Sequence, residues 1–333
     1  MLWKSYPPQP QPYTTMHTPA PSSRFPSASP GGAGAGDSCQ APRPFGPAPS
    51  EPLPPPVQVP AVASSITASS RCRWRIGSVP YLNAKPLVSG LETGISLAHP
   101  TTLAAQLRAG ELDAALAPIM ECIEHPEYEV ADGFGICCEG EVRSVFLHLQ
   151  RPLEHVQSVA LDAASKTSAM LTRVVLHDYG LRDVTYLPQG SRADAHLWIG
   201  DQALAFRDDH PTARVLDLGE AWLELTDLPF VFAVWALRTD TKPLPATTSD
   251  FESEVVTSCS RARAELAATL RATAVEGLRR RRAIARNMLE LTYLTRHIQY
   301  DIGPREKRAA ALFAEKLAAL GLIPSPPPTL RWI

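Results

Sequence analysis

The stretch "RIGSVPYLNAKPL" (Arg75–Leu87) joins a short apolar segment to the start of a helix through a sharp break. "RIGSV" is typical of a strand, and "NAKPLVSGLE" is typical of a short helix. Asn83 stands where the strand gives way to the helix. An asparagine at this point either caps the helix or faces a ligand at the carboxyl end of a strand. Position alone leaves these two readings equally open.

The same alternation continues along the chain. Strand-like stretches such as "ELDAALAP", "VQSVALD" and "AHLWIG" are separated by helix-like stretches such as "TTLAAQLRAG" and "SAMLTRVVLHDYG". Strands that alternate with helices predict an α/β fold, with parallel sheets covered on both faces.

The strands fall into two groups, at about 75–137 and 157–201, and the last ninety or so residues are helical. "EVRSVFLHLQ" and "PFVFAVWALR" are long strands that are expected to cross between the groups. The pattern predicts two lobes, each a mainly parallel sheet flanked by helices, with C-terminal helices and a ligand cleft between the lobes. The predicted boundaries are 71–150 with 232–333 for lobe one and 151–231 for lobe two. The predicted C-terminal helices span about 250–275, 277–299 and 304–320.

Residues 1–70 have a different composition. They hold 17 of the 33 prolines and only five charged residues. Such a segment cannot bury enough apolar surface to offset its ordering entropy, so we predict a disordered extension. It lacks the apolar core of a secretory signal, and no later run of 18 apolar residues suggests a membrane span. We therefore expect a soluble, cytoplasmic protein that does not act at a membrane.

Charge and cysteine usage exclude several classes of protein. Beyond residue 70, 29 Lys and Arg stand against 32 Asp and Glu, which argues against nucleic acid as the main partner. The run Arg279–Arg282 is read as a solvated helix face. The six cysteines form no CxxC pair, and no HExxH is present, so neither a metal site nor a disulfide framework is expected. Cys137 and Cys138 are predicted to lie in a buried strand.

Two further stretches carry candidate site residues. In "SVPYLNAKP", Ser78 and Tyr81 add hydroxyls beside Asn83. In "GEVRSVFLH", Ser144 is predicted to lie mid-strand. A serine there is usually only a small residue, and it becomes a stronger candidate for the site if the strand crosses the cleft. No GxSxG motif is present, so a serine hydrolase is a poor reading.

"LDAASKTSAM" places Ser165, Thr167 and Ser168 before a helix. A helix start favours an anion, and hydroxyls add donors, so a carboxylate suits this site and a phosphate is an alternative. An ordinary cap needs only one of the three. The stretch is not a Walker loop. Asp201 follows another strand end, and a helix cap is a better reading for it than a place in the cleft.

Seven stretches together resemble the chorismate dehydratase family in order and spacing. They are "GSVPYLNAKPL", "L…GELDAALAP", "GEVRSVFL", "VALDAASKTSAML", "LWIGDQAL", "DLGEAW" and "LPFVFAVWALR". The resemblance covers about residues 74–323. Two departures stand out: Glu141 replaces an expected proline, and Asp227 replaces an expected glycine.

The resemblance implies a type II periplasmic-binding-protein-like fold and a cytoplasmic lyase of the futalosine route of menaquinone biosynthesis. It implies dehydration of chorismate to 3-[(1-carboxyvinyl)oxy]benzoate without a cofactor or a metal. The residues that match the family's reacting centre are Asn83 and Ser144. Substrate contacts are expected from Ser78, Tyr81, Ser165, Thr167, Ser168 and Asp201.

Three other readings remain open from the sequence. A solute-binding protein of the same fold would hold a small carboxylate anion without converting it. The sister enzyme that handles a later cyclic intermediate of the pathway ranks lower, because its start differs from "SVPYLNAKPL". A ligand-sensing regulator also ranks low, because no helix-turn-helix module precedes the fold.

Overall fold

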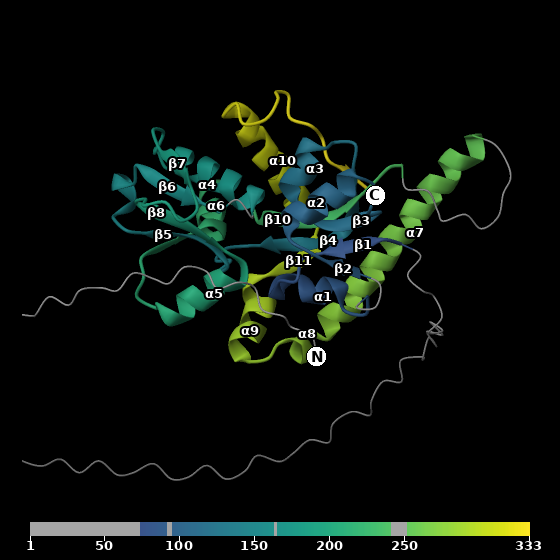
Figure 1. Cartoon of the computed structure of the whole chain (residues 1–333), viewed down its shortest axis with the longest axis horizontal. Coiled ribbons are helices and arrows are strands. Elements are labelled where there is room, and N and C mark those ends of the chain that lie inside the picture. The colour runs from purple at the N-terminus through teal and green to yellow at the C-terminus, as the bar shows by residue number, and fades with distance from the viewer. Residues whose placement is uncertain (1–73, 92–94, 163–164, 241–251) are drawn as a thin grey trace, which may run out of the picture. The chain divides into compact units, whose positions relative to one another are not determined.

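The structure is a computed structural model that describes residues 74–91, 95–162, 165–240 and 252–333. The predicted disorder of 1–70, together with Cys39 and Cys72, lies outside the described residues. The strands of the described chain form two sheets, which Figure 1 shows as two separate groups.

The first sheet has the order β11-β4-β10-β3-β1-β2, with β12 beside β4. Its parallel half is β1, β2 and β3, and β10 runs antiparallel to both β3 and β4. The strands are β1 (Ile76–Ser78), β2 (Ile95–Leu97), β3 (Ala114–Pro118), β4 (Glu129–Cys138), β10 (Phe230–Leu237), β11 (Gln299–Ile302) and β12 (Arg331–Trp332). The second sheet has the order β7-β6-β8-β5-β9, and its strands are β5 (Val145–Leu149), β6 (Ser158–Leu161), β7 (Thr185–Pro188), β8 (Ala195–Ile199) and β9 (Val215–Asp217).

Helices join and cover these strands. Around the first sheet they are η1 (Leu82–Ala84), α1 (Lys85–Val88), α2 (Pro100–Arg108), α3 (Ile119–Glu124), α7 (Glu252–Arg279), α8 (Arg281–Ile284), α9 (Met288–Thr292), η3 (Tyr293–His297) and α10 (Pro304–Ala319). Around the second sheet they are η2 (Leu153–His155), α4 (Lys166–Asp178), α5 (Gly200–Asp209) and α6 (Leu218–Thr226). The predicted α/β architecture with two sheet-based lobes is confirmed.

Both sheets are mixed, whereas the sequence predicted mainly parallel ones. In the second sheet, β5 is antiparallel to both of its neighbours. The strands that follow each crossing, β5 and β10, enter their sheets against the direction of the parallel strands. Apolar patterning identifies a strand but carries no information about the direction in which it pairs.

The crossings between the sheets lie at different residues from those predicted. The chain leaves the first sheet after Cys138 and enters the second at Val145, so β5 belongs to lobe two and not to lobe one. It returns between Thr226 and Phe230. The first crossing contains two residues with left-handed φ, Gly140 at 100° and Arg143 at 62°.

The two departures from the family pattern have local explanations at these crossings. Asp227 ends α6 with φ 56°, a left-handed conformation that glycine favours and that aspartate tolerates better than most residues. Glu141 accepts a hydrogen bond from the Arg207 guanidinium at 2.6 Å.

The C-terminal region is less helical than predicted. The helix predicted over 277–299 is interrupted at several points, and 299–302 forms strand β11 on the first sheet. The helix predicted over 304–320 is confirmed as α10. Cys137 and Cys138 lie in β4 with their side chains fully buried, as predicted.

Helix α7 packs against α1, the helix that follows Asn83 (Figure 1). The contact needs a glycine, because a Cβ on Gly277 would lie 1.7 Å from the Pro86 carbonyl oxygen. The turn that carries Asn83 is therefore supported from behind by a long helix.

Candidate functional site

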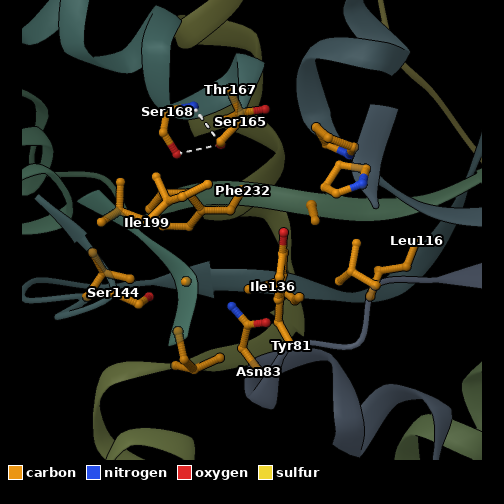
Figure 2. Close-up of a pocket in the computed structure, with 18 residues that line it drawn as sticks. Tyr81, Asn83, Leu116, Ile136, Ser144, Ser165, Thr167, Ser168, Ile199 and Phe232 are labelled. Atoms are coloured by element: carbon orange, nitrogen blue, oxygen red, sulfur yellow. Dashed lines mark hydrogen bonds between the residues drawn. The ribbon is translucent and has the colours of Figure 1, made fainter. Parts of the chain in front are cut away.

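A pocket lies where the carboxyl ends of strands from both sheets face each other (Figure 2). It has about 680 Å³ of empty space, part of it open to solvent. The first sheet and its connections contribute Val79, Tyr81, Asn83, Pro100, Leu116, Pro118, Ile136, Phe232, Ala233 and Ile298. The crossing into β5 contributes Val142, Ser144 and Val145, and the second sheet's connections contribute Ser165, Thr167, Ser168, Ile199 and Gly200. Strand ends of this kind are where open α/β sheets bind ligands.

Asn83 lies in the pocket wall and does not cap a helix. It is the middle residue of η1, whose N-cap is Tyr81, and the N-cap of α1 is Ala84. The Asn83 Oδ1 atom is buried and has no hydrogen-bond partner among the described residues. A buried polar atom is normally paired, so this one is available to a ligand. Figure 2 shows the amide beside Tyr81, whose side chain extends into the same space.

Asp201 supplies the cap that Asn83 does not. Its carboxylate accepts a hydrogen bond at 3.2 Å from the backbone N–H of Leu82, the first residue of η1. It makes no cap in its own helix, where Ile199 is the N-cap. Burial raises the pKa of Asp201, and the Leu82 N–H acts against that rise. Asp201 does not make the predicted cap of its own helix. It lies outside the pocket lining, and its contact with a ligand stays a prediction.

Ser144 lies in the crossing between the sheets and not within a strand. It immediately precedes β5 and is 1% exposed. Its carbonyl accepts from the Gly200 N–H at 2.8 Å, and its hydroxyl accepts from Tyr293 at 2.8 Å. The first bond holds the Ser144 backbone, and the second fixes its side chain in the pocket wall.

The hydroxyls at the start of α4 divide their roles. Ser165 is the N-cap, and its Oγ accepts from the Ser168 N–H at 3.3 Å while donating to the Ser168 Oγ at 2.7 Å. The Ser168 hydroxyl proton therefore remains available to a ligand. Thr167 Oγ1 accepts a long bond of 3.4 Å from the Met120 N–H. One hydroxyl serves as the cap, and Thr167 and Ser168 are buried in the pocket wall.

Ser78 does not reach the pocket. It is fully buried in β1, and its hydroxyl turns back to the Val79 carbonyl oxygen at 3.4 Å. Ser78 is therefore not part of the described lining, and its contact with substrate stays a prediction that this geometry does not favour. The other predicted residues, Tyr81, Asn83, Ser144, Ser165, Thr167 and Ser168, are brought together in one lining.

Tyr293 is a part of the site that the sequence did not reveal. It is 3% exposed, and its hydroxyl touches Ser144 from outside the pocket lining. Burial raises its pKa above the ordinary value of 10.0. Tyr293 lies 149 residues from Ser144 in the sequence, in a stretch predicted to be part of a helix, so no local signal marked it.

The described lining contains no aspartate, glutamate, histidine, lysine, arginine or cysteine. Its polar groups are hydroxyls and one amide, so the pocket does not repel an anion and offers it hydrogen-bond donors. Within the described ranges, no three histidine, cysteine or acidic side chains gather as metal ligands would. No helix in the same ranges has the length and apolarity of a membrane span.

Known proteins resemble the chain at two levels. The chorismate dehydratase of Thermus thermophilus is 29% identical over 271 residues, which is 74% of this chain and 95% of the relative. Two solved periplasmic binding proteins share the fold. The aliphatic sulphonate binding protein SsuA of Escherichia coli is 15% identical with TM-score 0.52, covering 76% of this chain and 94% of the other. The alkanesulfonate-binding protein SsuA of Xanthomonas axonopodis pv. citri, bound to MOPS, is 17% identical with TM-score 0.51, covering 78% and 98%.

The predicted periplasmic-binding-protein-like fold is therefore confirmed. A family described as menaquinone biosynthesis matches residues 74–319, which is nearly all of the described chain. The match includes every residue of the pocket lining. The chain belongs to this menaquinone biosynthesis family.

Proposed function

We propose that the protein is a hydro-lyase that converts chorismate to 3-[(1-carboxyvinyl)oxy]benzoate and water, as the name of its Thermus relative suggests. One structural observation carries the proposal. The pocket brings Asn83 and Ser144 together with the hydroxyls at the start of α4, with no carboxylate in the described lining to repel a dianion.

The reaction removes the proton on C3 of the chorismate ring and the hydroxyl on C4. The electron pair of the C3–H bond delocalises through the ring diene towards the C1 carboxylate, and departure of the C4 hydroxyl leaves an aromatic ring. Aromatisation supplies most of the driving force. The protein therefore has to orient the groups and stabilise the charge that develops.

The remaining step to assign is the removal of the C3 proton by a base. An amide is too weak a base for this step at neutral pH, and the described lining offers no acid or amine side chain. We infer that the substrate's own enolpyruvyl carboxylate, held close to C3, accepts the proton. Asn83 then orients the ring, and Ser144 donates a hydrogen bond as the C4 hydroxyl leaves.

The second carboxylate of the dianion is assigned to the start of α4. Ser168 has a hydroxyl proton to donate there, because its own oxygen already accepts a hydrogen bond from the Ser165 hydroxyl. Thr167 lies beside it in the lining. We also propose that the protein acts in the cytoplasm. Fractionation of the native cells would test this localisation.

The proposal is tested by incubating the purified protein with chorismate and separating the mixture by chromatography. We expect an aromatic product with the mass of chorismate less one water. Tight binding of chorismate without any product would favour the alternative, a solute-binding protein for a small carboxylate anion. The Ser144→Ala variant, run in parallel, separates enzymatic product from the spontaneous decay of chorismate.

Replacing Ser168 with alanine is expected to raise KM for chorismate about 10-fold, because a charge-assisted hydrogen bond to a carboxylate contributes roughly 1.5 kcal/mol. We expect kcat to change much less, since this carboxylate is remote from C3 and C4. Steady-state kinetics measure both constants.

Thr172→Val is the matched control for Ser168→Ala. Thr172 lies one turn further along α4, is fully buried and donates to the Ser168 carbonyl oxygen, but it does not line the pocket. Its loss should lower stability and leave KM unchanged. An unchanged KM in Ser168→Ala would remove this residue from the carboxylate site.

A further inference from the structure

A hydrogen bond behind the pocket wall fixes Ser144, which lines the pocket together with Asn83. The Tyr293 hydroxyl donates this bond to the Ser144 Oγ at 2.8 Å. Tyr293 belongs to η3 and reaches the wall from outside the lining. Because the Ser144 oxygen already accepts from Tyr293, the Ser144 hydroxyl proton is left to point elsewhere.

Asn83 offers the opposite polarity. Its amide oxygen, Oδ1, is a buried acceptor without a hydrogen-bond partner among the described residues. Tyr300 holds the Asn83 backbone in place by donating to its carbonyl oxygen at 3.0 Å.

We propose that Tyr293 is a positioning residue that sets the direction in which Ser144 hydrogen-bonds. It leaves the Ser144 hydroxyl to present a donor to the ligand, beside the acceptor that Asn83 Oδ1 presents. This inference rests on the proposed function and adds to it the kind of substrate group that the pair recognises.

A hydroxyl group fits this pair best. It accepts from Ser144 and donates to Asn83 Oδ1 at the same time, which no carboxylate can do, because a carboxylate only accepts. In chorismate the group with this property at the reacting centre is the C4 hydroxyl. A donor aimed at its oxygen stabilises the negative charge that grows as it leaves.

The test compares chorismate with the aromatic product, which has both carboxylates but no C4 hydroxyl. In Tyr293→Phe we expect kcat/KM for chorismate to fall about 10- to 100-fold, as for the loss of a buried hydrogen bond that acts on the transition state. We expect the inhibition constant of the product to change less than about 3-fold, since the product makes no use of this pair.

Tyr128→Phe is the matched control. Tyr128 is buried to a similar extent, at 5% exposed, and lies outside the pocket lining. Its loss should leave both the kinetics and the product inhibition unchanged. Thermal unfolding of all variants, together with the double variant Tyr293→Phe/Ser144→Ala, completes the set. The double variant should lose little more activity than Ser144→Ala alone, because Tyr293 acts through Ser144.

The outcomes separate the two proposals. If the wild-type protein neither binds nor converts chorismate, the proposed function fails. If it converts chorismate and Tyr293→Phe weakens chorismate turnover and product binding by equal factors, Tyr293 has only a structural role and the inference fails. If the single and double variants show fully additive losses, the connection through Ser144 is also wrong.

Discussion

Replacing Asn83 with alanine is expected to lower kcat for chorismate about 100- to 1,000-fold, the cost typical of losing one preorganised polar group at a reacting centre. The Asn83 Oδ1 atom is buried without a hydrogen-bond partner among the described residues, and Asn83 lines the pocket. Its role is to hold the substrate in the reactive orientation, so we expect the dissociation constant for the product to change far less than kcat. Rapid-quench and steady-state kinetics measure kcat, and calorimetry measures the dissociation constant of the product.

Gln106→Ala provides a stringent control for this prediction. The Gln106 Oε1 atom is also buried without a partner among the described residues, but Gln106 lies on α2 and not in the pocket lining. We expect its activity to match the wild type. Near-normal turnover in Asn83→Ala with intact binding would show that the orienting role is wrong.

Asn83→Asp distinguishes orientation from charge. An aspartate keeps the shape of the side chain but adds a negative charge beside a dianion, which should weaken substrate binding. If Asn83→Asp bound the product as tightly as the wild type, the ligand's negative charge would not lie near this residue.

Replacing Asp217 with alanine is expected to reduce the free energy of unfolding by about 3 kcal/mol, since it removes the shared acceptor of a buried network. The carboxylate is buried at the end of β9 and caps α6. It accepts hydrogen bonds from the backbone N–H groups of Val142, Arg143, Gly219 and Glu220 and from the Arg207 guanidinium. Burial raises the pKa of Asp217, and these donors act against the rise.

The same change should also lower kcat/KM. Asp217 holds the two residues that directly precede Ser144, and Arg143 there has the left-handed φ of 62° that most residues avoid. Without the carboxylate, the crossing segment has no partner for its N–H groups, and Ser144 loses its fixed position. Denaturant unfolding and steady-state kinetics measure the two effects.

Asp194→Ala is the control for Asp217→Ala. The Asp194 carboxylate also accepts from two backbone N–H groups and pairs with an arginine, but it is more exposed and lies at the far end of its sheet from the pocket. We expect a smaller loss of stability and normal activity. Asp217→Asn keeps the volume and one acceptor, so it should remain folded if the alanine variant does not. Wild-type stability in both Asp217 variants would contradict the prediction.

Several features of the fold could be predicted because they are local. Apolar runs bounded by turns identified the strands, and Pro304 at a first-turn position identified the last helix. The pairing partner of each strand could not be predicted in the same way, because it does not depend on neighbouring residues. Val145–Leu149 is an apolar run that suits either sheet, and it pairs with β8 and β9 of the second sheet after a turn with left-handed φ at Arg143. The short strand at 299–302 was read as helix because its pairing with β4 lies far away in the sequence.

The sequence by itself determined the α/β class, the family and a set of polar residues at strand ends, because each of these depends on patterns within a few neighbouring residues. The tertiary structure decided what those residues do. Asn83 is free to face the pocket because Asp201, which follows a strand of the other sheet, caps its turn. Ser144 has a defined orientation because Tyr293 reaches it from the C-terminal region. Hydrogen bonds between residues that are 119 and 149 positions apart leave no trace in local sequence, so only the folded chain shows which polar atoms are already satisfied and which remain for a ligand.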